Sequence, residues 1–176
     1  SFVPGQASLF NASSDWTERI IPYGLGQAYG AELFVEKDFN QLIPALQGGE
    51  IDIIMSGMTI TAARGEKVSF SKPYLNAGQM AIIRFADAGQ FGFKGAIFRP
   101  GARVAVQKKT TSEDFAAKSL KNANITHCDS ADEAFRLLKS GKVDFLVHDA
   151  ATSWSLATDK SKQDLMSLNT ELTDEQ

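Results

Sequence analysis

The sequence has little of the chemistry that builds cross-links and metal centres. Its 176 residues include one cysteine, Cys128, and two histidines, His127 and His148. A single cysteine excludes an internal disulfide and a cysteine-rich metal site. Two histidines are too few to favour a histidine-based metal centre. We therefore expect no metal and no other cofactor.

An excess of one charge and long apolar runs are missing as well. Lys and Arg number 18 and Asp and Glu number 21, and neither sign dominates any long stretch. A nucleic-acid-binding protein would show a basic patch, so we expect no nucleic-acid partner. No run of 18 apolar residues predicts a membrane span. Residues 1–4 have no basic or apolar signal-peptide region, which suits a mature secreted protein and a cytosolic one equally.

What is present is the composition of a globular protein with a substantial core. Hydrophobic residues make up 43% of the chain and charged residues 22%, and the length fits one domain or two small lobes. Helical spacing predicts a helix over 39–46, ended by Gly48-Gly49. The apolar run Ile51 to Met55 predicts a strand buried on both faces of a parallel sheet. Further strands are predicted at 80–83, 104–106 and 143–147. Two further helices are predicted, one capped by Thr111 or Ser112 and one capped by Ser130.

An internal repeat is the most informative pattern. Residues 46–54 match residues 138–146 at a constant offset of 92, each as a helix end, a glycine turn, an Asp and an apolar run. Two similar α/β units suggest two lobes, although chance similarity between such units is the simpler alternative. Ligands of open α/β sheets bind beyond the carboxyl ends of the strands. We therefore expect the loops 56–59 and 148–149 to line one cleft between the lobes.

Three longer motifs indicate a family. Residues 52–74, 104–112 and 141–149 closely resemble the bacterial extracellular solute-binding proteins of family 3, which bind polar amino acids. The resemblance covers roughly 38–156. Its motifs also occur in the ligand-binding core of ionotropic glutamate receptors, where a membrane pore follows the Pro-Tyr segment. Here residues 76–83 continue directly, which favours a soluble binding protein.

The chemistry of an amino-acid ligand suggests a role for several residues. The ligand carries a carboxylate and an ammonium group, so its receptor needs a fixed cation and a fixed anion. Arg64 suits the carboxylate through its planar fork, with help from Thr59 and from Thr111 at a helix N-terminus. Asp149 suits the ammonium. The resemblance implies these roles and adds others, and the full predicted ligand-binding set is Phe39, Ser56, Gly57, Thr59, Arg64, Gln107, Thr110, Thr111, His148 and Asp149.

Each of these residues also has a purely structural interpretation. Arg64 could be a surface residue paired with Glu66, and Asp149 could cap the helix that follows it. Phe39 could belong to the core, and His148 could be a packed, hydrogen-bonded residue. Lys109 departs from the family, which commonly has Gly at that position, and this raises the conformational cost if the backbone there needs a positive φ.

The repeat predicts an α/β protein with two lobes, and the family resemblance implies the two-lobed type II periplasmic binding protein fold. Lobe 1 is expected over 1–79, lobe 2 over 80–149, and a return segment toward lobe 1 over 150–176. The family continues further, so we expect either a fragment or a trimmed lobe 1. The expected function is the substrate-binding component of an amino-acid ABC transporter. The alternatives are a ligand-sensing receptor domain and, less favoured, a dehydratase-like enzyme.

The expected partners follow from that function. They are a small amino-acid ligand and the membrane permease of an ABC transporter. We expect a monomer that works in the periplasm or outside the cell, with its signal peptide removed and with no catalytic residues.

Overall fold

A computed structural model of the chain describes residues 37–76, 78–156, 164–168 and 172–173. Its centre is a five-stranded mixed sheet with the order β3-β2-β4-β1-β5. The central pairs β2–β3 and β2–β4 are parallel, and β1 pairs antiparallel with both β4 and β5. The strands are β1 Gln79–Arg84, β2 Arg103–Gln107, β3 Asn124–Cys128, β4 Phe145–Asp149 and β5 Leu165–Ser167.

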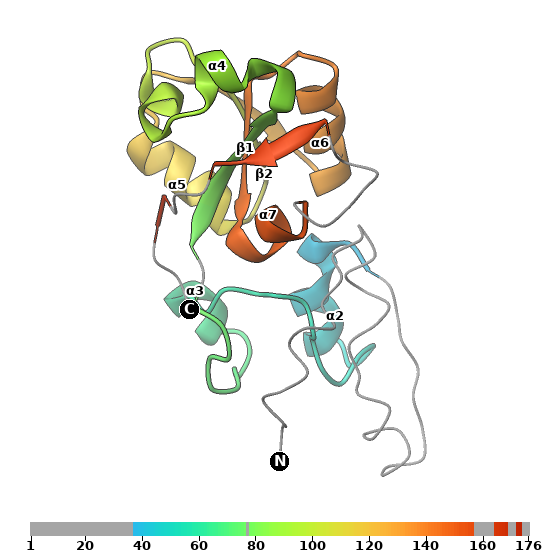
Figure 1. Cartoon of the computed structure of the whole chain (residues 1–176). Coiled ribbons are helices and arrows are strands. Elements are labelled where there is room, and N and C mark those ends of the chain that lie inside the picture. The colour runs from blue at the N-terminus through green and yellow to red at the C-terminus, as the bar shows by residue number, and fades with distance from the viewer. Residues whose placement is uncertain (1–36, 77, 157–163, 169–171, 174–176) are drawn as a thin grey trace.

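Helices flank this sheet, while α2 and α3 lie apart from it, below it in the view of Figure 1. Helices α5 and α6 each follow a strand, which gives the α/β alternation expected from the sequence. The helices are η2 Phe39–Gln41, α2 Leu42–Gln47, α3 Ala62–Gly65, η3 Phe85–Asp87, α4 Ala88–Phe91, η4 Lys94–Phe98, α5 Thr111–Ser119, α6 Ala131–Lys139 and α7 Ala150–Leu156.

The core consists of two apolar clusters, which take alternate residues of the same strands. In β1, Ile83 belongs to the cluster that contains Phe115 of α5, while Ile82 belongs to the cluster that contains Leu138 of α6. Successive side chains of a strand point to opposite faces, so the sheet is covered on both sides. Each buried Ile or Leu contributes about 1.5–3 kcal/mol relative to an exposed one. Burial of both faces of the sheet explains why β1, β2 and β4 are nearly continuous apolar runs.

Most of the predicted elements are confirmed in this region. The predicted strand at 143–147 begins two residues later than expected, at Phe145. The first residue of α5 is Thr111, and its N-cap is Thr110 rather than Thr111 or Ser112. Ser130 caps α6 as predicted, because its hydroxyl accepts a hydrogen bond from the Glu133 N–H.

The predicted buried strand at 51–55 is wrong. These residues form no strand, and Ile53 is 71% exposed. A strand buried on both faces needs a hydrogen-bonded neighbour on each side and helices above and below it. Among the described residues, every strand pairing lies within 79–167. Residues 51–55 therefore have no neighbouring strand there to pair with, in spite of their apolar composition.

The repeat is nevertheless visible in the backbone where each helix ends. Gly49 and Gly141, 92 residues apart, have φ of 71° and 73°. The N–H of Glu50 donates to the carbonyl of Ala45 at 2.9 Å, and the N–H of Lys142 donates to that of Leu137 at 3.0 Å. Both helices therefore end in the same left-handed glycine turn.

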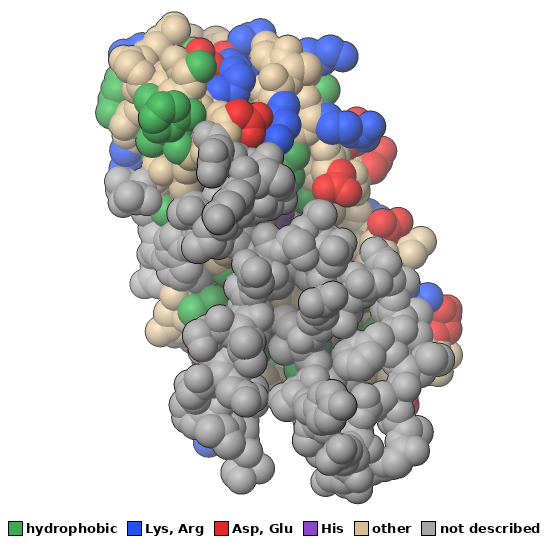
Figure 2. Space-filling model, turned by 45° about the vertical axis from the view of Figure 1, so that its right-hand side comes forward, with side chains coloured by type: hydrophobic (Ala, Val, Ile, Leu, Met, Phe, Trp, Pro, Cys, Tyr) green, Lys and Arg blue, Asp and Glu red, His purple; other side chains and the backbone are tan. Residues whose placement is uncertain are grey.

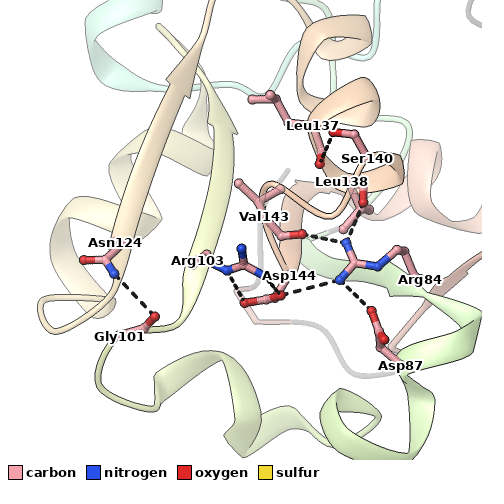
Figure 3. A network of polar contacts seen from close by, with 10 residues as sticks. All are labelled: Arg84, Asp87, Gly101, Arg103, Asn124, Leu137, Leu138, Ser140, Val143 and Asp144. Carbon is pink, nitrogen blue, oxygen red and sulfur yellow. Dashed lines mark hydrogen bonds and ion pairs between the residues drawn. The ribbon is translucent and has the colours of Figure 1, made fainter.

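After this turn the two copies diverge. In the second copy Asp144 binds arginine side chains of two neighbouring strands. Arg103 makes two hydrogen bonds to the Asp144 carboxylate, and Arg84 lies 3.5 Å from it (Figure 3). Arg84 also donates to the carbonyl of Val143 at 2.7 Å and pairs with Asp87 at 2.6 Å. The Arg103 guanidinium lowers the pKa of Asp144, against burial, which raises it. The matching Asp52 is exposed.

The sheet extends beyond the range predicted for lobe 2. Strand β5 pairs with β1 at Ile82 and Ser167, so part of the predicted return segment lies in this sheet. The N–H of Gln79 also donates to the Thr173 hydroxyl at 2.8 Å. The boundaries 1–79, 80–149 and 150–176 remain predictions.

The surface of the described part mixes both charge signs. Lys and Arg side chains are interspersed with Asp and Glu side chains on the face seen in Figure 2. Within the ranges that the structure describes, none of the helices has the length and apolar character needed to cross a membrane.

Candidate functional site

Arg64 is held in place by the short helix α3. The Thr61 hydroxyl caps this helix by accepting a hydrogen bond from the Arg64 N–H at 3.3 Å. The half-buried Arg64 side chain then folds back, and its Nη1 donates to the carbonyl of Thr59 at 2.8 Å. Its guanidinium carbon lies 5.4 Å from the centre of the Phe39 ring. The structure therefore brings together Phe39, Thr59 and Arg64, three residues of the predicted ligand-binding set.

Arg64 also reaches the loop that precedes α5. Its Nη2 lies 3.4 Å from the carbonyl oxygen of Lys109, which has a φ of 60°. The backbone N–H of Lys109 donates to Glu113 Oε2 at 2.8 Å, and the other oxygen of Glu113 lies 2.7 Å from His127 Nδ1. The positive φ considered for the position of Lys109 is thus present, and a lysine adopts it.

The N-terminus of α5 presents Thr111 beside this loop. The Thr110 hydroxyl donates to the carbonyl of Gln107 at 2.7 Å, which closes the turn between β2 and the helix. The Thr111 hydroxyl accepts a hydrogen bond from Gln79 Nε2 at 2.9 Å. The free N–H groups at the start of a helix favour an anion, so this end suits a carboxylate.

Asp149 ends β4 and caps α7. One carboxylate oxygen accepts from the Thr152 N–H at 2.8 Å and the other from the Thr152 hydroxyl at 2.9 Å. His148 Nδ1 lies 2.5 Å from the same carboxylate. Burial raises the pKa of Asp149, but His148 and the hydrogen bonds from Thr152 outweigh it and lower that pKa to about 2. Asp149 is therefore a carboxylate at neutral pH, with room for about one more donor among its four acceptor positions.

The imidazole ring of His148 packs against a neighbouring aromatic ring. Its ring stacks on Phe135 of α6 with 6.2 Å between ring centres, and its side chain is 18% exposed. This agrees with the packed, hydrogen-bonded interpretation of His148. Contact with a ligand remains a prediction for this residue.

A hollow joins the two loops that the repeat singled out. Gly57 and Thr59 from the first loop and Asp149 from the second line it, together with the segment 70–75. Gly57 and Asp149 are the equivalent positions of the two copies, 92 residues apart. The lining residues are Gly57, Met58, Thr59, Ile60, Phe70, Ser71, Lys72, Pro73, Tyr74, Leu75, Asp149 and Ala151.

The remaining predicted residues lie outside the lining of this hollow. They are Phe39, Ser56, Arg64, Gln107, Thr110, Thr111 and His148, and of these Phe39 and Arg64 contact each other directly. The structure also adds residues to which the sequence analysis assigned no role. Pro73 and Tyr74 lie in a motif of the family resemblance, so that motif was the available signal, whereas nothing local distinguished Gln79.

The described residues contain no group of three or more His, Cys, Asp or Glu side chains placed to hold a metal ion. The chemistry they offer is a guanidinium and a helix N-terminus for an anion, and a carboxylate for a cation.

Comparison with known proteins gives this arrangement a family. Residues 27–124 match the model of the bacterial extracellular solute-binding proteins, family 3. The chain belongs to this family, which confirms the resemblance and the α/β fold class. Among solved structures, the arginine-bound form of a truncated ArgBP from T. maritima is similar with a TM-score of 0.74 and 34% identity, over 86% of this chain and 70% of that one.

Two curated relatives show that proteins similar to this chain include both a binding protein and an enzyme. The glutamine-binding protein of Geobacillus stearothermophilus is 36% identical over 85% of this chain and 60% of its own length. The cyclohexadienyl dehydratase of Pseudomonas aeruginosa is 32% identical over 72% of this chain and 47% of its own length. The chain thus spans about half the length of the curated relatives that it matches.

Proposed function

We propose that this chain is the substrate-binding component of an amino-acid ABC transporter, or part of one, and that it captures an amino acid between its lobes. One observation carries the proposal: Thr59, a hydrogen-bond partner of Arg64, lines the same hollow as Asp149. A fixed cation beside the hollow and a fixed anion in its lining complement a zwitterion. Relatives such as the glutamine-binding protein of Geobacillus stearothermophilus support the ligand class.

The carboxylate of the ligand is assigned to Arg64 and to the N-terminus of α5. Both lie at the loop around Lys109, because Arg64 contacts its carbonyl and Thr111 begins the helix two residues later. A guanidinium fork and helix N–H groups are the two protein features that best stabilise a carboxylate. In this proposal the ligand replaces or supplements the contact between Arg64 and the Lys109 carbonyl.

The ammonium group is assigned to Asp149. Its carboxylate is ionised at neutral pH and already fixed by Thr152, so it would pay little entropy on binding. The side chain of Asp149 is 32% exposed, which leaves it accessible from the hollow. Capping of α7 and ligand binding are compatible, since a carboxylate accepts several donors.

Transport rather than catalysis is the proposed role. A dehydratase-like reaction needs a general acid or base in addition to an ammonium-binding carboxylate. A second carboxylate for that role is not among the residues that line the described hollow, where Asp149 is the one acidic side chain beside Lys72 and Tyr74. The membrane permease of the transporter is the proposed partner, the chain is proposed to be a monomer, and the proposed place is the periplasm or the extracellular space, as the family name suggests.

A thermal-shift screen against the twenty amino acids tests the proposal. A ligand that binds only the folded state at 100 times its Kd stabilises the protein by about 2.7 kcal/mol. We expect a clear rise in Tm with one or a few polar amino acids and none with their N-acetylated amides, which lack both charges. No rise with any amino acid would contradict the proposal.

A further inference from the structure

Gln79 is a buried polar side chain at the first position of β1. It is 1% exposed, and its amide lies against the first two residues of α5. The Nε2 group donates to Thr111 Oγ1 at 2.9 Å, and Oε1 accepts a hydrogen bond from the Ser112 hydroxyl. Ser112 is itself 5% exposed. A buried amide needs such partners, and here Nε2 faces Thr111 while Oε1 faces Ser112.

This orientation determines what the Thr111 hydroxyl can do. A threonine hydroxyl has one proton to donate and two lone pairs that accept. Because Gln79 donates to Thr111, it occupies a lone pair and leaves the proton for another acceptor. The opposite orientation of the amide would place Oε1 against Thr111 and would take up that proton. In the structure Oε1 instead faces Ser112, whose hydroxyl donates to it.

The same residue is tied to the other end of the proposed site. In the β1–β4 ladder Gln79 stands opposite Asp149, and the N–H of Ala150 donates to the carbonyl of Gly78 at 2.8 Å. Gln79 therefore joins the start of α5 to the end of β4. These are the two elements to which the ligand's carboxylate and ammonium groups are assigned.

We propose that Gln79 is a positioning residue, which directs the Thr111 hydroxyl proton toward the carboxylate of the bound amino acid. This inference rests on the proposed function, because the acceptor is the ligand of that site. Gln79 itself does not contact the ligand. Its effect is to make the carboxylate, rather than a neutral carbonyl group, the preferred acceptor at the N-terminus of α5.

Calorimetric titration of Gln79→Met tests the proposal. Met has nearly the same length and fills the buried space, but it cannot orient the hydroxyl. The probes are the amino acid that gives the largest Tm rise in the wild-type screen and its primary amide. We expect Gln79→Met to weaken binding of the amino acid at least about tenfold, because a hydrogen bond to a charged group is lost. Binding of the amide should change less than about threefold.

Three further variants make the result specific. Thr111→Val should weaken the amino acid to a similar extent, and adding it to Gln79→Met should cost little more, since both act through one hydroxyl. Gln79→Leu, which also lacks the Nε2 donor and adds no charge, should reproduce the selective loss if the Met variant does not fold. Gln90→Met, at an exposed position of α4, is the matched control and should bind both probes as the wild type does.

The outcomes separate this inference from the proposed function. Equal weakening of the amino acid and its amide would show a merely structural role and would overturn the inference, as would unchanged binding of both. A wild-type chain that binds none of the twenty amino acids would overturn the proposed function before any variant is made.

Discussion

Asp149 combines a structural contact with the proposed ligand contact in one carboxylate. It caps α7 through the Thr152 N–H, and it is the anion of the hollow. The sequence left these two interpretations open, and the structure establishes the cap without excluding the ammonium. A substitution that keeps the cap and removes the charge separates them.

Asp149→Asn is that substitution. Asn caps a helix about as well as Asp, so α7 should remain folded. Binding of an α-amino acid should weaken by roughly 2–5 kcal/mol, because its ammonium loses a paired charge. The matching des-amino acid should bind nearly as before. Competition measurements with both compounds check this, and equal weakening of both, or of neither, would remove Asp149 from the ammonium site.

Lys109 has an unfavourable backbone conformation, which contacts with neighbouring residues hold in place. Its φ of 60° is costly for any residue with a Cβ atom, and Glu113 holds its N–H. Lys109→Gly should stabilise the protein by about 0.5–1 kcal/mol. The substitution removes the backbone strain at this position, and the greater conformational entropy of glycine in the unfolded chain offsets part of that gain.

Thermal unfolding measures this effect. Lys108→Gly is the control, because Lys108 is the adjacent residue and is outside the positive-φ set. We expect a higher Tm for Lys109→Gly and a lower one for Lys108→Gly. A decrease in both would mean that the positive φ at 109 stores no strain.

At the scale of elements, the second copy of the repeat depends on Asp144. This carboxylate joins β4 to Arg103 of β2 and to Arg84 of β1, and its side chain is only 12% exposed. Asp144→Asn should lower the free energy of unfolding at pH 7 by about 1.5–3 kcal/mol, since charged hydrogen bonds are lost. Chemical denaturation measures this change. Asp129→Asn, on an exposed pair with Lys108, is the control and should leave stability unchanged.

The same residue predicts a pH dependence. The folded pKa of Asp144 lies below its ordinary value, so its contribution is present above the unfolded pKa of about 3.9. It is lost as the pH falls from about 4 through the folded pKa. Asp144→Asn should therefore show a smaller loss of stability over that range than the wild type does. Parallel curves for the two proteins would contradict the assignment.

Sequence patterns predicted the elements that depend on local signals. The glycine turns at Gly49 and Gly141, the Ser130 cap and the apolar strands of the sheet follow from side-chain chemistry and spacing within a few residues. The strand at 51–55 failed, because its composition does not say whether a pairing partner exists. Strands β3 and β5 were missed since their exposed or short segments carry weak apolar patterns.

The candidate site shows the same division. Motif positions put Phe39, Thr59 and Arg64 in one predicted ligand-binding set, and the structure shows that they lie together. The repeat predicted that the loops with Gly57 and Asp149 line one cleft, and both residues line the hollow. The role of Gln79 required knowledge of which strand start meets which helix start. That is a contact between residues 32 positions apart, which no local pattern encodes.

At the scale of the whole molecule, the account predicts closure. The residues assigned to the carboxylate and to the ammonium come from both proposed lobes, so a ligand that contacts all of them favours the closed state by its differential affinity. Small-angle scattering should show a smaller radius of gyration when the best amino acid of the screen is added at saturation. An unchanged radius would contradict hinge closure in this chain.

The central claim is that Arg64 binds the carboxylate of an amino acid. Arg64→Ala keeps the backbone N–H that Thr61 caps, so α3 and the fold should remain. Arg136→Ala, at an exposed position of α6, is the matched control. Calorimetric titration with the best amino acid should show a loss of at least about 2–3 kcal/mol for Arg64→Ala and wild-type affinity for the control. Unchanged affinity in Arg64→Ala would contradict the account.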